Sequence, residues 1–124
     1  MSRGFLIVTL MSLIGCSSGT LNEAEQANRR LSQELMVSML LRRCPQSSNE
    51  VASQFVLRVG QRLMNAQAAR GTGANISLKL IECQEPLSFV APSNTVLIST
   101  GMLSLMPSEA SLAFLLAHEF SHIF

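Results

Sequence analysis

The spacing of apolar residues constrains the fold of this chain more than any other feature of its sequence. Apolar residues recur every three or four positions over residues 21–43 and 49–71, which predicts two helices. Asn22 and Asn49 are suited to cap these helices, and Gly71 to end the second. We expect both apolar stripes to face the core. Their members are Leu31, Leu35, Met36, Met39 and Leu40 in the first, and Val51, Phe55, Val59, Leu63 and Ala66 in the second.

The pattern then changes to alternation. Residues 75–81 alternate apolar with polar, which predicts a half-buried strand. Two further strands are expected at 87–91 and 95–100, on either side of a turn at 92–94. A final helix begins after Ser108, a residue type that caps helices well. Two helices, a small three-stranded sheet and a last helix predict an α+β fold.

Composition excludes several classes of protein. Hydrophobic residues make up 48% of the 124 residues and charged residues 14%, so the chain is not a disordered tail. The chain has nine Lys and Arg and eight acidic residues, so it has no large positive net charge to attract nucleic acid. We therefore expect no nucleic-acid partner.

The N-terminus is typical of a bacterial lipoprotein. A basic head and an apolar segment end in Leu13-Ile14-Gly15-Cys16, which predicts a signal peptide at 1–15. The apolar segment is too short to span a bilayer permanently. Cys16 would be lipidated and 16–20 would form a tether, so we expect a membrane partner through this anchor. Ser17 after the cysteine favours the outer membrane, with the domain at 21–124 facing the periplasm.

The last predicted helix carries His118-Glu119-Phe120-Ser121-His122, an HExxH motif. Residues four apart lie on one helix face, so both imidazoles can reach a single zinc ion. Glu119 lies about 100° further round, where it can take a proton from a water molecule at the metal. The motif predicts one Zn²⁺ per site, with His118 and His122 as ligands and Glu119 as the catalytic general base.

From residue 51 to 124 the chain resembles the HtpX-like and Ste-type zinc metalloendopeptidases, family forty-eight of the metallopeptidases, in their periplasmic lipoprotein branch. The segments that carry the resemblance are 55–63, 89–92, 96–103 and 109–122. The chain departs from the family pattern at Leu87-Ser88, where Asn-Ala is usual, and at Ser93-Asn94, where Gly-Gly is usual. The resemblance implies a gluzincin-like fold and hydrolysis of peptide bonds in cell-envelope proteins, so protein or peptide substrates.

The resemblance also implies a substrate strand and a third ligand. In the family, a strand before the active-site helix presents its edge to the substrate backbone. This role would fall to Thr95, Val96, Leu97, Ile98 and Ser99. The family takes its third zinc ligand from a Glu-x-x-x-Asp motif on a later helix, and the sequence ends two residues after His122. We therefore expect an N-terminal part of such a protease, with the C-terminal part of the domain missing and no activity alone.

The remaining cysteines form an even pair. If Cys16 carries the lipid, Cys44 and Cys83 remain in an oxidising compartment, either joined in a disulfide or as two unpaired buried thiols.

The rival to the protease interpretation is a non-catalytic envelope lipoprotein that serves as a binding module, or a decaying gene fragment. Translation of the DNA beyond Phe124 in all frames, to look for Glu-x-x-x-Asp, discriminates these.

Overall fold

The computed structural model describes residues 22–124. The predicted signal peptide, Cys16 and the tether lie outside this part of the chain. Within it, no helix is both long enough and apolar enough to cross a membrane.

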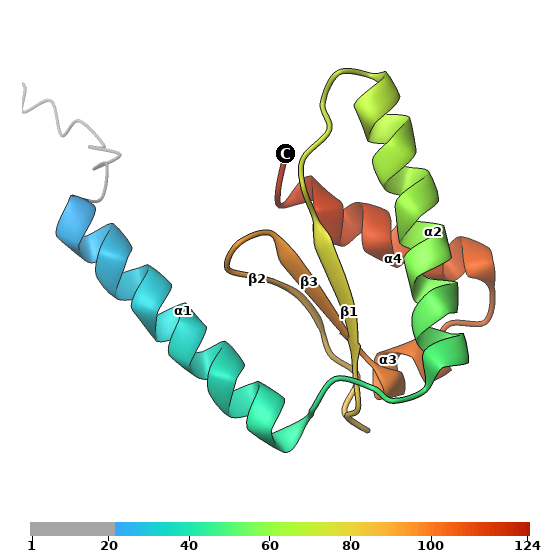
Figure 1. Ribbon diagram of the computed structural model, residues 1–124, viewed down its shortest axis with the longest axis horizontal. Helices are drawn as coiled ribbons and strands as arrows, with labels where there is room; N and C mark the ends of the chain where they lie inside the picture. The colour runs from blue at the N-terminus through green and yellow to red at the C-terminus, as the bar shows by residue number, and fades with distance from the viewer. Residues whose placement is uncertain (1–21) are drawn as a thin grey trace, which may run out of the picture.

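A three-stranded mixed sheet lies at the centre of the fold, which confirms the predicted α+β class (Figure 1). Its strands are β1 (Ser77–Ile81), β2 (Ser88–Ala91) and β3 (Thr95–Ser99). The order is β1-β3-β2, with β1 parallel and β2 antiparallel to β3. Each strand is one or two residues shorter than its predicted segment.

β3 is the central strand, so the prediction that residues 95–99 form the substrate edge is wrong. Both sides of β3 are hydrogen-bonded, to β1 and to β2. Val96, Leu97 and Ile98 are each at most 1% exposed. Three consecutive buried residues are typical of a strand covered on both faces. β1 and β2 form the two edges of the sheet, and the end of β1 is bridged by Gln46.

One face of the sheet is covered by α2 (Glu50–Ala69) and α4 (Glu109–Ser121) (Figure 1). The Asn49 side chain accepts a hydrogen bond from the Ala52 amide, as its capping role predicts. Gly71, at φ 75°, follows the helix end in the left-handed conformation that glycine adopts without strain. The main core is made of the following residues: Val56, Val59, Ile76, Leu78, Leu80, Val96, Ile98, Leu112, Leu116 and Phe120. Val51 and Ala66, predicted to face the core, are exposed, and Val56 is buried instead.

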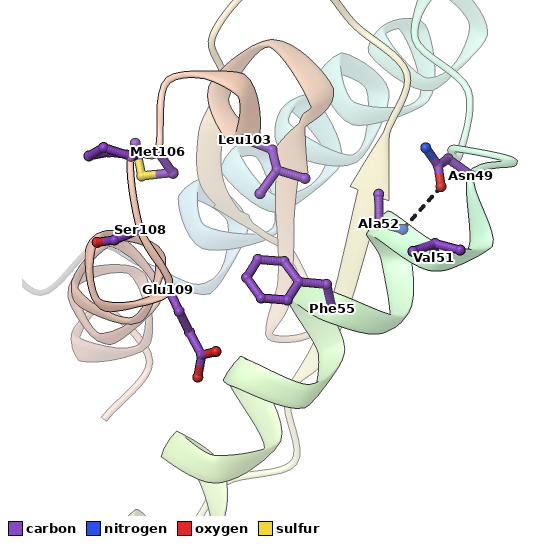
Figure 2. Close-up of a pocket in the computed structure, with 9 residues that line it drawn as sticks. Asn49, Val51, Ala52, Phe55, Leu103, Met106, Ser108 and Glu109 are labelled. Atoms are coloured by element: carbon purple, nitrogen blue, oxygen red, sulfur yellow. Dashed lines mark hydrogen bonds between the residues drawn. The ribbon is translucent and has the colours of Figure 1, made fainter.

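A short helix that the sequence did not reveal, α3 (Thr100–Ser104), follows β3 directly. Five residues are too few to show a helical period. Leu103 of α3 and Phe55 of α2 line a hollow between the starts of α2 and α4 (Figure 2). The HExxH residues are not among the residues that line it.

α1 (Glu23–Arg43) covers part of the other face of the sheet (Figure 1). Its start has the predicted cap. The Asn22 side chain accepts a hydrogen bond from the Glu25 amide, and the Glu25 side chain accepts one from the Asn22 amide. Val37 and Leu41 of α1 pack against the smaller core.

The prediction that the apolar stripe of α1 is core is wrong for four of its five residues. Leu31, Leu35, Met36 and Met39 are 61–70% exposed, and only Leu40 packs against the smaller core. Val37 and Leu41 lie two positions beyond Leu35 and Met39, about 200° round the helix. α1 therefore packs against the sheet with the side that carries Val37 and Leu41, which lies opposite to most of the predicted stripe.

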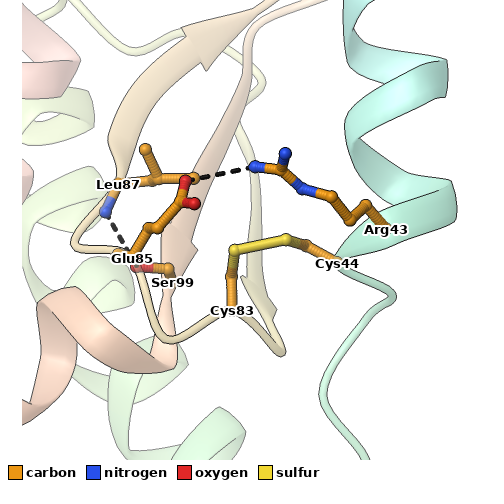
Figure 3. Close-up of polar contacts among 6 residues, drawn as sticks. All are labelled: Arg43, Cys44, Cys83, Glu85, Leu87 and Ser99. Carbon is orange, nitrogen blue, oxygen red and sulfur yellow. Dashed lines mark hydrogen bonds and ion pairs between the residues drawn. A yellow bond between two sulfur atoms is a disulfide. The ribbon is translucent and has the colours of Figure 1, made fainter.

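Cys44 and Cys83 are joined in a disulfide, with their Cα atoms 5.1 Å apart (Figure 3). The bridge ties the end of α1 to the segment after β1, and both cysteines belong to the smaller core. Beside it, Arg43 Nη2 lies 3.1 Å from Glu85 Oε2. Both of these side chains are mostly exposed, so the ion pair contributes little stability.

The turn at 92–94 joins β2 to β3 as predicted. Ser93 and Asn94 both have positive φ, 62° and 54°. Asparagine tolerates this left-handed conformation better than most residues, while serine has no such advantage. This geometry explains why glycines suit the two positions.

Candidate active site

The buried apolar residues of α4 determine which face of this helix packs against the sheet. Ser108 caps the helix as predicted, accepting a hydrogen bond from the Ser111 amide at 3.2 Å. Leu112, Leu116 and Phe120, spaced four apart, are at most 2% exposed. This spacing places one face of α4 against the sheet. His118 and the helix C-cap, His122, consequently lie on an exposed face.

The two histidines are brought together as the motif predicts. The Nε2 atoms of His118 and His122 are 3.4 Å apart, and their rings meet edge to face. Two nitrogens at 2.0–2.1 Å from a tetrahedral zinc lie about 3.3–3.4 Å apart. The separation of the two nitrogens therefore matches that of two ligands of a tetrahedral zinc ion.

Glu119 points toward the sheet rather than into solvent. It is 7% exposed, and its Oε1 accepts a hydrogen bond from the Ser88 hydroxyl of β2 at 2.7 Å. Burial of an acidic side chain is uncommon unless the carboxylate has a hydrogen-bond partner. A carboxylate next to two imidazoles can exchange protons with a water molecule held there.

β2 forms the outer edge of the sheet beside these residues. The Ser99 amide donates to the Leu87 carbonyl at 2.9 Å, so 87 and 99 form a hydrogen-bonded pair of the antiparallel ladder. Because such pairs alternate, the main chain of Phe89 and Ala91 faces β3. The main-chain groups of Ser88 and Val90 therefore face the open edge, where another extended chain can pair.

A groove of about 590 Å³ runs along this edge and joins it to the motif. The strand contributes residues 88–91, and His118, Glu119 and His122 form one side. Gln33 of α1 lines the groove as well, so α1 borders the space beside the edge. β3, predicted to be the substrate strand, is separated from the groove by β2.

Three other acidic residues have partners away from the two histidines. Glu109 pairs with Arg62 at the opposite end of α4. Glu82 accepts a hydrogen bond from the Ser47 hydroxyl, and Glu85 pairs with Arg43. Across residues 22–124, no three His, Cys, Asp or Glu side chains gather where they could share a metal ion. Catalytic zinc sites normally use three protein ligands, and within residues 22–124 the two histidines have no third such side chain placed to share a metal ion with them.

Two residues of the site were not singled out as functional by the sequence. Ser88 was noted only as a departure from the usual Asn-Ala, and its hydroxyl now proves to contact Glu119. That departure, a hydroxyl at a position where Ala is usual, was the available signal. Gln33 lies about 85 residues before the motif on a different helix, and no sequence signal connects the two.

Comparison with known proteins gives one match. The sequence model described as peptidase family M48 matches residues 50–124, which is more than half of the chain and includes the whole groove except Gln33. No match was found among curated proteins or among solved structures.

Proposed function

Because the chain belongs to peptidase family M48, we propose that it is a zinc-dependent metalloendopeptidase domain, in which His118 and His122 hold the metal and Glu119 is the general base. The observation that carries the proposal is the 3.4 Å separation of the two Nε2 atoms, which suits tetrahedral zinc. The adjacent buried carboxylate of Glu119 supplies the base that peptide hydrolysis needs.

The chemistry of each group follows from its position. Zinc supplies Lewis acidity and makes water nucleophilic near neutral pH. Glu119 takes the proton of the water that attacks the peptide carbonyl. When the carbon–nitrogen bond breaks, Glu119 returns that proton to the leaving amine.

The substrate in this proposal is an extended peptide that pairs with the open edge of β2. Main-chain pairing at a sheet edge recognises backbone rather than side chains. The open main-chain groups of Ser88 and Val90 lie in the same groove as Glu119. Gln33 on α1 borders the same groove.

We propose further that the protein works at the bacterial cell envelope, lipid-anchored at Cys16, in the outer membrane and facing the periplasm. The Leu13 to Cys16 motif supports the anchor, and proteins of the envelope would be the substrates within its reach. Mass spectrometry of the membrane fraction, with Cys16→Ser as control, tests it. An unmodified mature chain that keeps an intact Cys16 in the soluble fraction would disprove the anchor.

The peptidase proposal is tested by casein hydrolysis, using the product of the complete coding sequence with zinc and with a chelator. Glu119→Gln is the matched variant, since both imidazoles remain and only the base is lost. Chelator-sensitive cleavage that disappears in Glu119→Gln supports the proposal. Equal cleavage by the variant removes Glu119 from the mechanism, and zinc binding without any cleavage favours the non-catalytic binding module.

A further inference from the structure

We propose that Ser88 is a positioning residue that holds the carboxylate of Glu119 in place for proton transfer. This inference rests on the proposed function of Glu119 as the general base. Ser88 lies on β2, whereas Glu119 lies on α4, 31 residues later in the chain. The contact therefore joins the active-site helix to the strand at the open edge.

The contact has the geometry of a strong hydrogen bond. The Ser88 hydroxyl lies 2.7 Å from Glu119 Oε1, close to the range of charge-assisted bonds between a hydroxyl and a carboxylate. Within residues 22–124, the second oxygen of Glu119, Oε2, has no hydrogen-bond partner. One oxygen is thus held by the strand, and the other remains available to take a proton.

Ser88 is itself firmly held. Its Cα is paired with Ile98 of the central strand, and Ile98 is fully buried. The preceding Leu87 amide donates to the Ser99 hydroxyl at 2.8 Å, and the Leu87 carbonyl accepts from the Ser99 amide. A side chain on a strand that is paired along one edge can fix its partner more tightly than one on a loop.

The same residue connects the base to the open edge of β2. The main-chain groups of Ser88 face that edge, while its hydroxyl bonds to Glu119. A peptide paired with the edge would be aligned on the residue that also holds the base. The distance between the scissile bond and the base would then be set by one residue, which favours reaction through orientation.

The first test uses the metal-free protein and does not depend on activity. NMR scalar couplings of the Glu119 side chain are compared in the wild type, Ser88→Ala and Ser88→Thr. Thr keeps a hydroxyl and suits a strand. Ser104→Ala is a control that makes the same change at an exposed position of α3, where the hydroxyl bonds to the Gly101 carbonyl and not to Glu119. We expect one Glu119 rotamer in the wild type, Ser88→Thr and Ser104→Ala, and rotamer averaging in Ser88→Ala. A single unchanged rotamer in Ser88→Ala would overturn the proposal.

The second test measures kcat and KM of the zinc-loaded product of the complete coding sequence, as in the casein assay. Ser88→Ala should lower kcat by about tenfold, since a hydrogen bond to a charged group has this order of effect. KM should stay within about twofold, and Ser88→Thr should restore kcat. Rotamer averaging with unchanged kcat would refute the positioning role. Absence of cleavage by the wild type would count against the peptidase function, while the NMR result would still decide the Ser88 contact.

Discussion

Ser99 is the N-cap of α3. Replacing it with Ala should destabilise the protein far more than the same change at the N-cap of α4. Ser99 is fully buried, and its hydroxyl makes three hydrogen bonds. It accepts from the Leu87 amide at 2.8 Å and from the Met102 amide at 3.0 Å, and it donates to the Glu85 carbonyl at 2.6 Å. Figure 3 shows the contact between Ser99 and Leu87.

The magnitude follows from these partners. Loss of a serine cap costs about 1 kcal/mol, and each buried group left without a partner costs about 1–3 kcal/mol more. We expect Ser99→Ala to lower the free energy of unfolding by about 3 kcal/mol. Ser108→Ala is the matched control, because Ser108 is an exposed cap with a single amide partner, and it should cost only about 1 kcal/mol.

Urea denaturation of both variants, followed by far-ultraviolet circular dichroism, measures the difference. In a domain of about 100 residues, 1 kcal/mol shifts Tm by about 4–8 °C, so thermal melting separates the variants as well. Equal losses at Ser99 and Ser108, within about 0.5 kcal/mol, would refute the reasoning that burial and partner number set the cost.

Two further predictions concern stability. Replacing Cys44 and Cys83 together with Ala should lower the free energy of unfolding by about 4 kcal/mol, because their bridge spans 39 positions. Reductant should bring the wild type to a similar value, and two free thiols in the denatured, unreduced protein would contradict the bridge. Leu116→Ala should cost about 3–5 kcal/mol and Leu35→Ala less than about 1 kcal/mol, since Leu116 is fully buried and Leu35 is 61% exposed. Equal losses in chemical denaturation would place the stripe of α1 in the core after all.

Local signals predicted the three longer helices, the strands and the motif. Caps at Asn22, Asn49 and Ser108 act over three residues, so the sequence alone reveals them. The spacing of His118 and His122 is likewise fixed by one helical turn. Each of these features depends on neighbours within a few positions along the chain.

Features that depend on packing between distant segments were not predicted. The apolar period of α1 marks a helix, but it does not say which side meets the sheet, and Val37 and Leu41 compete with Leu35 and Met39. Strand order depends on which strands pair across the whole domain. For β3, the unbroken run of apolar residues at 96–98 was the sign of a central position.

The sequence names the residues of the candidate site but not the residues that surround them. The motif predicts that Glu119 is a base, whereas the contact between Ser88 and Glu119 depends on how α4 packs against β2. Gln33 enters the groove only because α1 packs against the same sheet. These contacts join segments that lie between 30 and 90 residues apart, and no local pattern specifies them.

Zinc titration calorimetry on the purified protein tests whether His118 and His122 form a zinc site with Glu119 beside it. Glu119→Gln and Glu109→Ala serve as controls that leave both imidazoles in place. We expect one zinc per chain, bound weakly by residues 22–124 because they bring two histidines together without a third ligand. Binding should be lost in His118→Ala and in His122→Ala and kept in both controls. Undiminished zinc binding in both histidine variants would show that these residues do not hold the metal.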